Sequence, residues 1–157
     1  MATVKPFPAA ANSSYKDYER PVAIYQKSKV VDFAECAALK GSALAQNDVI
    51  EVIPAKAGEV CVGLYSKILV ADAGASTCDI GVTGDDADGF TNALALNGTA
   101  GTVTYSTGAY MLNTTGPVLI GGKSFATADT IDLVIDSATA PTTGRIEIVA
   151  LFINYNE

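Results

Sequence analysis

The chain of 157 residues contains no histidine and no tryptophan, and it has only three cysteines. Without histidine, Ser-His-Asp and Cys-His catalysis and histidine-ligated zinc or iron are excluded. Cys36, Cys61 and Cys78 are odd in number and lack metal-like spacing, so they indicate no disulfide framework. Each is expected to be a buried, reduced thiol. We therefore expect a protein that is not an enzyme and that has no cofactor.

Charged residues are also scarce, at 17% of the chain against 49% hydrophobic residues. With so few charges on its exterior, a lone monomer would expose much uncharged surface, and association with other copies or with a larger structure is expected. The longest unbroken apolar run, residues 148–153, is far shorter than the roughly 20 residues that cross a bilayer. The first residues have no apolar segment of the kind that a signal peptide requires. These features predict synthesis in a host cytoplasm and no membrane partner.

The charges that are present are unevenly distributed. Residues 1–70 contain eight Lys and Arg against seven Asp and Glu, whereas residues 71–157 contain two against ten. Binding to nucleic acid requires a basic face, so no direct nucleic-acid partner is expected. The asymmetry fits a solvated acidic surface that maintains solubility. It also fits a near-neutral N-terminal part that contacts a partner while the acidic part faces solvent.

The last 28 residues predict two strands joined by a loop. Residues 131–136 alternate between apolar and acidic side chains, which indicates a half-buried strand. Residues 145–155 begin by alternating and then become continuously apolar, which indicates a strand that is covered on both faces. Val149, Leu151 and Ile153 are therefore candidates for a subunit interface. The competing interpretation is an ordinary sandwich interior, covered by the second sheet or by the N-terminal segment.

Residues 1–21 predict an extended N-terminal arm rather than a core element, because three prolines remove backbone donors and no periodicity is present. Aromatic and arginine side chains on an irregular segment are typical of interface anchors. Phe7, Tyr15, Tyr18 and Arg20 are the candidates for contact with a partner. The alternative is a free terminus, which is common at chain ends.

Residues 22–157 predict a single all-β domain. Short strands are expected at 22–33, 49–53, 60–70, 78–82, 102–105, 110–112, 118–120 and 123–126, before the two C-terminal strands. A short helix or two turns are expected within 34–46, an acidic loop at 83–92 and one helical turn at 93–96. Strands of this length with turn signals every 8–12 residues favour a jelly-roll or Greek-key β-sandwich.

The acidic loop contains the best candidates for a metal site, Asp85, Asp86 and Asp88. Their carboxylates could supply oxygen ligands to Ca²⁺, although the segment lacks the terminal carboxylates of an EF-hand loop. A solvated acidic loop is the simpler interpretation. A carbohydrate-binding or calcium-binding jelly-roll module therefore remains the alternative function.

Two segments carry a resemblance to a known family. CDIGVTGDDADGF (residues 78–90) and TIDLVIDSATAPTTGRIEIVALFI (residues 130–153) together resemble small structural proteins of tailed bacteriophages, in particular capsid decoration, or cement, proteins. The resemblance implies a jelly roll or β-sandwich, often a homotrimer, on the exterior of the virion capsid. There it would bind the major capsid protein and hold neighbouring subunits against internal DNA pressure. Head-fibre and tail-associated host-attachment proteins also belong to this group.

Overall fold

The structure is a computed structural model, and it describes residues 24–111 and 121–154. Within these residues the elements in chain order are β1 (Ile24–Asp32), α2 (Phe33–Lys40), β2 (Val49–Ala55), β3 (Glu59–Val70), β4 (Thr77–Val82), β5 (Asp86–Ala95), β6 (Val103–Tyr105), β7 (Lys123–Ser124), β8 (Asp129–Ile135) and β9 (Arg145–Asn154). The expected short helix is α2. Asp32 caps its start by accepting backbone hydrogen bonds, and Gly41 ends it in the left-handed conformation.

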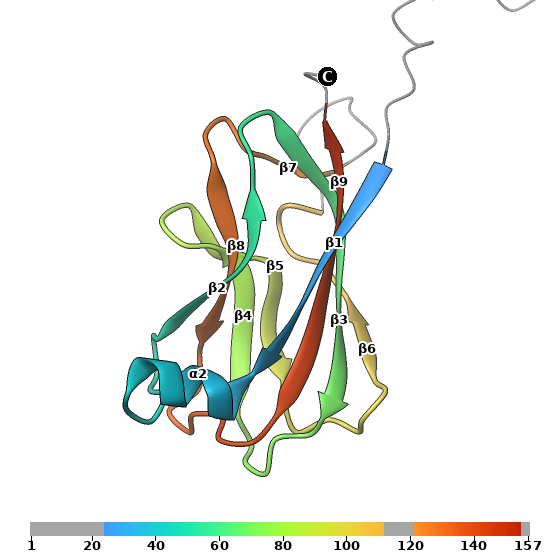
Figure 1. Cartoon of the computed structure of the whole chain (residues 1–157). Helices are drawn as coiled ribbons and strands as arrows, with labels where there is room; N and C mark the ends of the chain where they lie inside the picture. Colours follow the sequence, from blue (N-terminus) through green and yellow to red (C-terminus); the bar gives the residue numbers. More distant parts are fainter. Residues whose placement is uncertain (1–23, 112–120, 155–157) are drawn as a thin grey trace, which may run out of the picture.

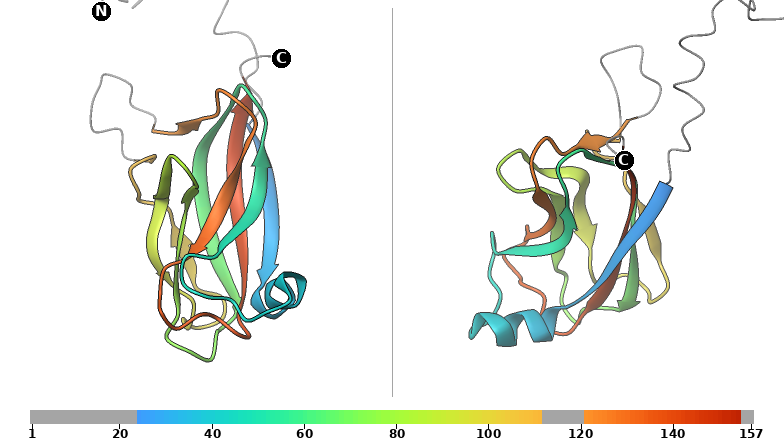
Figure 2. Two further views of the ribbon diagram at one scale, coloured as in Figure 1. Left: turned by 90° about the vertical axis from the view of Figure 1, so that its left-hand side faces the viewer. Right: turned by 45° about the horizontal axis from the view of Figure 1, so that its top comes forward.

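The strands form two antiparallel sheets that face each other across the core (Figure 1). Sheet A has the order β1-β9-β3-β6, with the short β7 also pairing with β3, and sheet B has the order β2-β8-β4-β5. Figure 2 shows the same two layers from two further directions. Strands from the beginning and the end of the domain are neighbours in both sheets, β1 with β9 and β2 with β8, which is the strand order of a jelly roll. The predicted all-β sandwich is confirmed.

Side chains that alternate along the inner faces of the two sheets form the apolar core. On β4 and β8 the alternation seen in the sequence correctly predicts which side chains point inward. The buried inner residues of these two strands are Cys78, Ile80, Val82, Ile131, Leu133 and Ile135. Each large aliphatic side chain buried in this way contributes roughly 1.5–3 kcal/mol to stability.

β9 is an inner strand of sheet A and organises that sheet. It pairs with β1 from Ile24 opposite Ile153 to Asp32 opposite Arg145, without a register shift. On its other side it pairs with β3, where the register shifts between Cys61 and Gly63. A β-bulge therefore lies between Cys61 and Gly63. It inserts one unpaired residue and bends β3 around the core.

The acidic segment differs from the sequence-based expectation. The loop predicted at 83–92 and the helical turn predicted at 93–96 are wrong, because residues 86–95 form β5 and pair with β4. Two register shifts interrupt this pairing, one on each side of Ile80. As a result Phe90 and Thr91 are both buried although they are consecutive. Bulges of this kind remove the two-residue alternation by which a strand is identified in a sequence.

Two other strand predictions also need correction. β2 continues through Pro54 to Ala55, which an edge strand tolerates because the missing N–H can face outward. Tyr110 and Met111 lie in a turn and not in a strand. Residue 112 and the strand predicted at 118–120 lie outside the described residues.

The cysteines agree with the expectation at two positions of three. Cys61 and Cys78 are buried free thiols, whereas Cys36 on α2 is only half-buried, so the prediction for Cys36 is wrong. Burial raises the pKa of the Cys61 thiol to about 12 and raises the pKa of Cys78 as well. Thiols that stay protonated in this way are poor nucleophiles.

Asp72 joins two loops at one end of the sandwich through hydrogen bonds to its carboxylate. The residue is only 5% exposed. Its Oδ1 accepts hydrogen bonds from the backbone N–H groups of Thr142 (2.9 Å) and Thr143 (3.1 Å), in the loop between β8 and β9. Its Oδ2 accepts from the N–H of Gly74 (3.0 Å) and the hydroxyl of Ser76 (2.8 Å). Burial opposes the charged form, but these hydrogen bonds hold the pKa of Asp72 at about 2.

Candidate interaction surface

The two faces of β9 have different surroundings. The even-numbered residues from 146 to 152 are fully buried and belong to the core cluster. Val149, Leu151 and Ile153 point the other way, because successive side chains of a strand alternate between faces. Val149 is only 1% exposed, yet neither it nor Ile153 belongs to the core cluster. The three candidates for a subunit interface therefore lie on the outer face of sheet A, where sheet B does not cover them.

A row of side chains across sheet A brings two tyrosines to this outer face. Val149 pairs with Ser28 of β1 on one side and with Tyr65 of β3 on the other. Tyr65 in turn pairs with Tyr105 of β6, and the two ring centroids are 6.0 Å apart. This row therefore begins with the small Ser28 at the β1 edge and ends with the two aromatic rings of Tyr65 and Tyr105 at the β6 edge.

The neighbouring rows extend the apolar surface to both edges of the sheet. Ile153 lies between Ile24 and Val60, while Val30 and Val103 stand at the two ends of the row that contains Glu147. We call the following outer-face residues the sheet A face: Ile24, Val30, Val60, Tyr65, Val103, Tyr105, Val149, Leu151 and Ile153. Ile24 is 66% exposed and Tyr105 is 71% exposed. Val149 and Ile153 in the middle of the face are only 1% and 8% exposed, so its exposed apolar side chains are concentrated at the β1 and β6 edges. Exposed apolar side chains that gather on one face of a sheet are typical of an interaction site.

A buried charged cluster fixes the edge strand that contributes to this face. Lys27 donates hydrogen bonds to the Glu59 carboxylate (2.7 Å) and to the carbonyl of Pro54 on β2 (2.7 Å). Its Nζ lies 4.5 Å from the ring centroid of Phe152, on which Tyr25 stacks. Tyr25 also donates to Glu59 (2.6 Å). The cluster joins β1 to β3, β9 and sheet B, so the sheet A face is presented on a rigid support.

Burial raises the pKa of Glu59, but its hydrogen bonds, first the one from Lys27, lower it to below its ordinary value. Glu59 is 2% exposed and therefore stays ionised inside the protein only because these partners surround it. Removal of the Lys27 charge would leave the Glu59 carboxylate buried and uncompensated, whereas the Lys27 side chain is 23% exposed.

The two sheets differ sharply in charge. The strands of sheet B carry six acidic residues and no lysine or arginine. The strands of sheet A carry five basic and three acidic residues. Burial and the nearby charges of Asp136 and Asp88 raise the pKa of Asp79 on β4, which reflects this concentration of negative charge. Five of the ten acidic residues in 71–157 lie in sheet B, namely Asp79, Asp86, Asp88, Asp129 and Asp132.

The structure gives Asp85, Asp86 and Asp88 different partners. Asp85 forms an ion pair with Lys123 and accepts a hydrogen bond from the Tyr110 hydroxyl (2.6 Å); the Lys123 hydrogen bond is the first cause that lowers its pKa. Asp88 accepts from the side-chain amide of Asn92 (2.5 Å), which is the first cause that lowers the pKa of Asp88. Among the described residues, no group of three histidine, cysteine or carboxylate side chains is placed to hold a metal ion.

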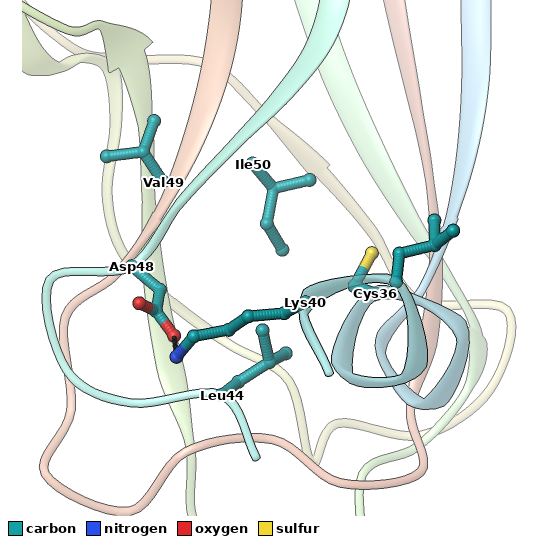
Figure 3. A pocket seen from close by; sticks show the side chains of 7 residues that line it. Cys36, Lys40, Leu44, Asp48, Val49 and Ile50 are labelled. Atoms are coloured by element: carbon teal, nitrogen blue, oxygen red, sulfur yellow. Dashed lines mark hydrogen bonds and ion pairs between the residues drawn. The ribbon is translucent and has the colours of Figure 1, made fainter. Parts of the chain in front are cut away.

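A hollow of about 320 Å³ lies between α2 and the beginning of β2 (Figure 3). It is lined by Cys36, Leu39, Lys40, Leu44, Asp48, Val49 and Ile50. Its charged groups, Lys40 and Asp48, are paired with each other at 2.5 Å. Burial is the first cause that raises the pKa of the Cys36 thiol, so this group is not an activated nucleophile. The hollow therefore offers no group with the chemistry of a catalytic site.

The predicted anchors of the N-terminal arm, Phe7, Tyr15, Tyr18 and Arg20, lie outside the described residues, as does the whole segment 1–21. Within residues 24–111 and 121–154, no helix is long and apolar enough to span a membrane.

Sequence reasoning found the β9 part of the sheet A face and missed its margins. Ile24, Val30 and Tyr105 are exposed apolar residues that the pattern of their own strands does not single out. Their common position depends on the pairing of β1 with β9 and of β6 with β3, which joins residues far apart in the chain. The nearest signal in the sequence is the consecutive pair Val30 and Val31, of which one must face away from the core.

Comparison with known proteins shows the class to which this fold belongs. No model of a known protein family matches the chain, and no curated protein sequence matches it. Chains of several solved structures do match, among them one chain from each of three phage capsids. The first, described as "Cyanophage Pam1 capsid asymmetric unit", has a TM-score of 0.59 and 14% identity, over 85% of this chain and 86% of that one.

The second, "Capsid of Ralstonia phage GP4", matches with a TM-score of 0.56 and 14% identity, over 99% of this chain and 93% of that one. The third, "Acidic stable capsid structure of Helicobacter pylori bacteriophage KHP30", has a TM-score of 0.53 and 12% identity, over 83% and 87%. The sandwich of this protein is therefore a fold found in chains of phage capsid structures.

Proposed function

We propose that this protein is a structural component of a bacteriophage virion, a decoration or cement protein that binds the outside of the capsid as an oligomer. The observation that carries the proposal is the fold shared with chains of three phage capsid structures, each matched over most of both chains. The absence of histidine from the sequence, which excludes the commonest catalytic groups, supports the same function.

The mechanism in this proposal is mechanical. A protein that contacts two adjacent subunits of the major capsid protein binds only while those subunits stay together, so its binding free energy adds to the work of separating them. Phe7, Tyr15, Tyr18 and Arg20 of the N-terminal arm are the proposed shell contacts, because aromatic and arginine side chains dominate interface energies. A trimer is the proposed oligomeric state, as the resemblance to decoration proteins implies.

Truncation of the arm tests this proposal. The full chain and a variant that lacks residues 1–20 are mixed with empty, expanded heads of the parent phage, and bound protein is measured by sedimentation of the heads. The full chain is expected to saturate the heads and to raise the temperature at which they come apart. The truncated variant is expected to remain folded, with an unchanged far-UV circular dichroism spectrum, and not to bind.

Two results would contradict the proposal at different levels. Saturation of the heads by the truncated variant would remove the arm from the shell contact and leave the decoration role intact. Failure of the full, folded chain to bind heads of the parent phage at any stage of maturation would overturn the decoration role itself.

A further inference from the structure

We propose that copies of this protein contact one another through the sheet A face, and that sheet B points away from the oligomer. This inference rests on the proposed function in one respect, because it identifies the surface of the oligomer that this function requires. It names the partner as a second copy of the chain. The charge and composition of the face support it.

The distribution of charge favours this face for self-association. The chain has a net charge of −7, so two copies repel each other unless the contact surfaces avoid the acidic residues. The strands of sheet B carry six acidic residues and no basic ones. Contact through sheet B would bring these like charges together, whereas contact through sheet A keeps them far apart.

The ionisable side chains on the outer side of sheet A are balanced. Asp32 lies opposite Arg145, and Lys67 lies opposite Glu147, which gives two residues of each sign and a net charge of zero. A second copy presents the same four groups, so each charge can find an opposite partner across the contact. A face with no net charge brings no net repulsion when identical subunits meet through it.

The size of the face suits a weak contact. Strands are about 4.8 Å apart and rise about 3.3 Å per residue, so the plane of this sheet measures on the order of 500 Å². Because Val149 and Ile153 are already only 1% and 8% exposed, two copies together would bury less than about 1,000 Å², which is below the size of a standard specific interface. The face alone therefore predicts an oligomer that dissociates on dilution and that a bound capsid would reinforce.

The side chains of the face match the composition of interface centres. The Tyr65 and Tyr105 rings lie together beside Val149, with Leu151 and Ile153 further along β9. Aromatic and aliphatic residues of this kind, with charges restricted to one end, are typical of the centre of a subunit contact. By comparison, the exposed Leu39 and Val49 beside the hollow are two isolated residues on different elements.

A pair of matched double variants tests the inference in the full chain. Ile24→Lys with Tyr105→Lys adds two charges at opposite edges of the sheet A face, at positions that are 66% and 71% exposed. Leu39→Lys with Val49→Lys makes the same chemical change at exposed positions outside the face. Molar mass is measured by sedimentation velocity over a range of concentrations, and folding is checked by circular dichroism and thermal melting.

The wild type and the Leu39/Val49 variant are expected to associate with the same dissociation constant. The Ile24/Tyr105 variant is expected to keep the melting temperature of a folded monomer and to weaken association by at least about tenfold. The inference is overturned if this variant associates like the wild type, or if the wild type is monomeric at every concentration. A monomeric wild type that still saturates phage heads would overturn only this inference, whereas an oligomer that never binds heads would overturn only the proposed function.

Discussion

Replacement of Asp72 by asparagine would remove one charge from the loops at the end of the sandwich and leave the side-chain volume almost unchanged. The wild-type carboxylate accepts hydrogen bonds from three backbone N–H groups and from the hydroxyls of Ser76 and Thr143. Its pKa of about 2, against about 3.9 in an unfolded chain, corresponds to about 2–3 kcal/mol of stability at neutral pH. One carboxylate oxygen would also be replaced by an NH₂ group, which cannot accept a hydrogen bond from the N–H groups that point at it. The hydrogen bonds lost in this way lower the stability further.

We therefore expect Asp72→Asn to lower the free energy of unfolding by about 2–4 kcal/mol at pH 7, and the melting temperature by about 5–10 °C. Because the folded pKa is below the unfolded one, the stabilisation by the carboxylate is complete above about pH 4. It is lost as the pH falls towards 2. The difference between wild type and variant should therefore be large near neutral pH and should close in acid.

Urea unfolding followed by far-UV circular dichroism at pH 7, 4 and 3 would measure this difference at a fixed protein concentration. Asp129→Asn is the matched control, since Asp129 is exposed and its carboxylate accepts one local hydrogen bond, from the N–H of Thr130. That variant should change stability by less than about 0.5 kcal/mol. A loss for Asp72→Asn that is below about 1 kcal/mol, or that does not change with pH, would refute the reasoning.

Three further predictions concern the core. Glu59→Gln should cost about 1–3 kcal/mol in thermal or urea unfolding, because it removes a charge-assisted hydrogen bond from the half-buried Lys27; a neutral result would mean that Lys27 turns to solvent. Gly81→Ala should severely destabilise or misfold the β4–β5 hairpin, because a Cβ there would overlap the carbonyl oxygen of Asp86, and a normal circular dichroism spectrum and melting temperature would contradict this. The Cys61 thiol should not react with a disulfide reagent at pH 8 unless the protein unfolds, since burial raises its pKa to about 12; rapid labelling of the native protein would show that the core opens.

The sequence predicts the sandwich correctly wherever one face of a strand is buried without interruption. Residues 131–135 of β8 alternate cleanly, and their inner side chains are fully buried. β5 was not predicted as a strand, because acidic residues occupy its beginning and because the register of its pairing with β4 shifts twice. Local propensity indicates a loop there, and only the pairing with a neighbouring strand makes the segment a β-strand.

The candidate interaction surface was predictable in part for the same reason. The continuously apolar run of β9 indicates that both faces of this strand are covered, and Val149 on the outer face is indeed almost fully buried. Tyr105 carries no such signal, because β6 has only three residues. Its place beside Tyr65 follows from a long-range register that a pattern within one strand does not contain.

The charge asymmetry acquires a physical meaning only in the folded protein. In the sequence it separates two halves of the chain, but the chain passes between the sheets repeatedly. The structure converts the asymmetry into one acidic sheet and one sheet with a small excess of basic residues. This arrangement defines which side of the sandwich can approach a partner and which side repels a second copy.

Electron cryomicroscopy of the parent phage head tests the central claim most directly. The account predicts density for this sandwich on the outer surface of the capsid, between adjacent major capsid subunits, with copies in contact through the sheet A face and sheet B exposed to solvent. Heads that carry no such density, or density found only inside the shell or on the tail, would contradict it.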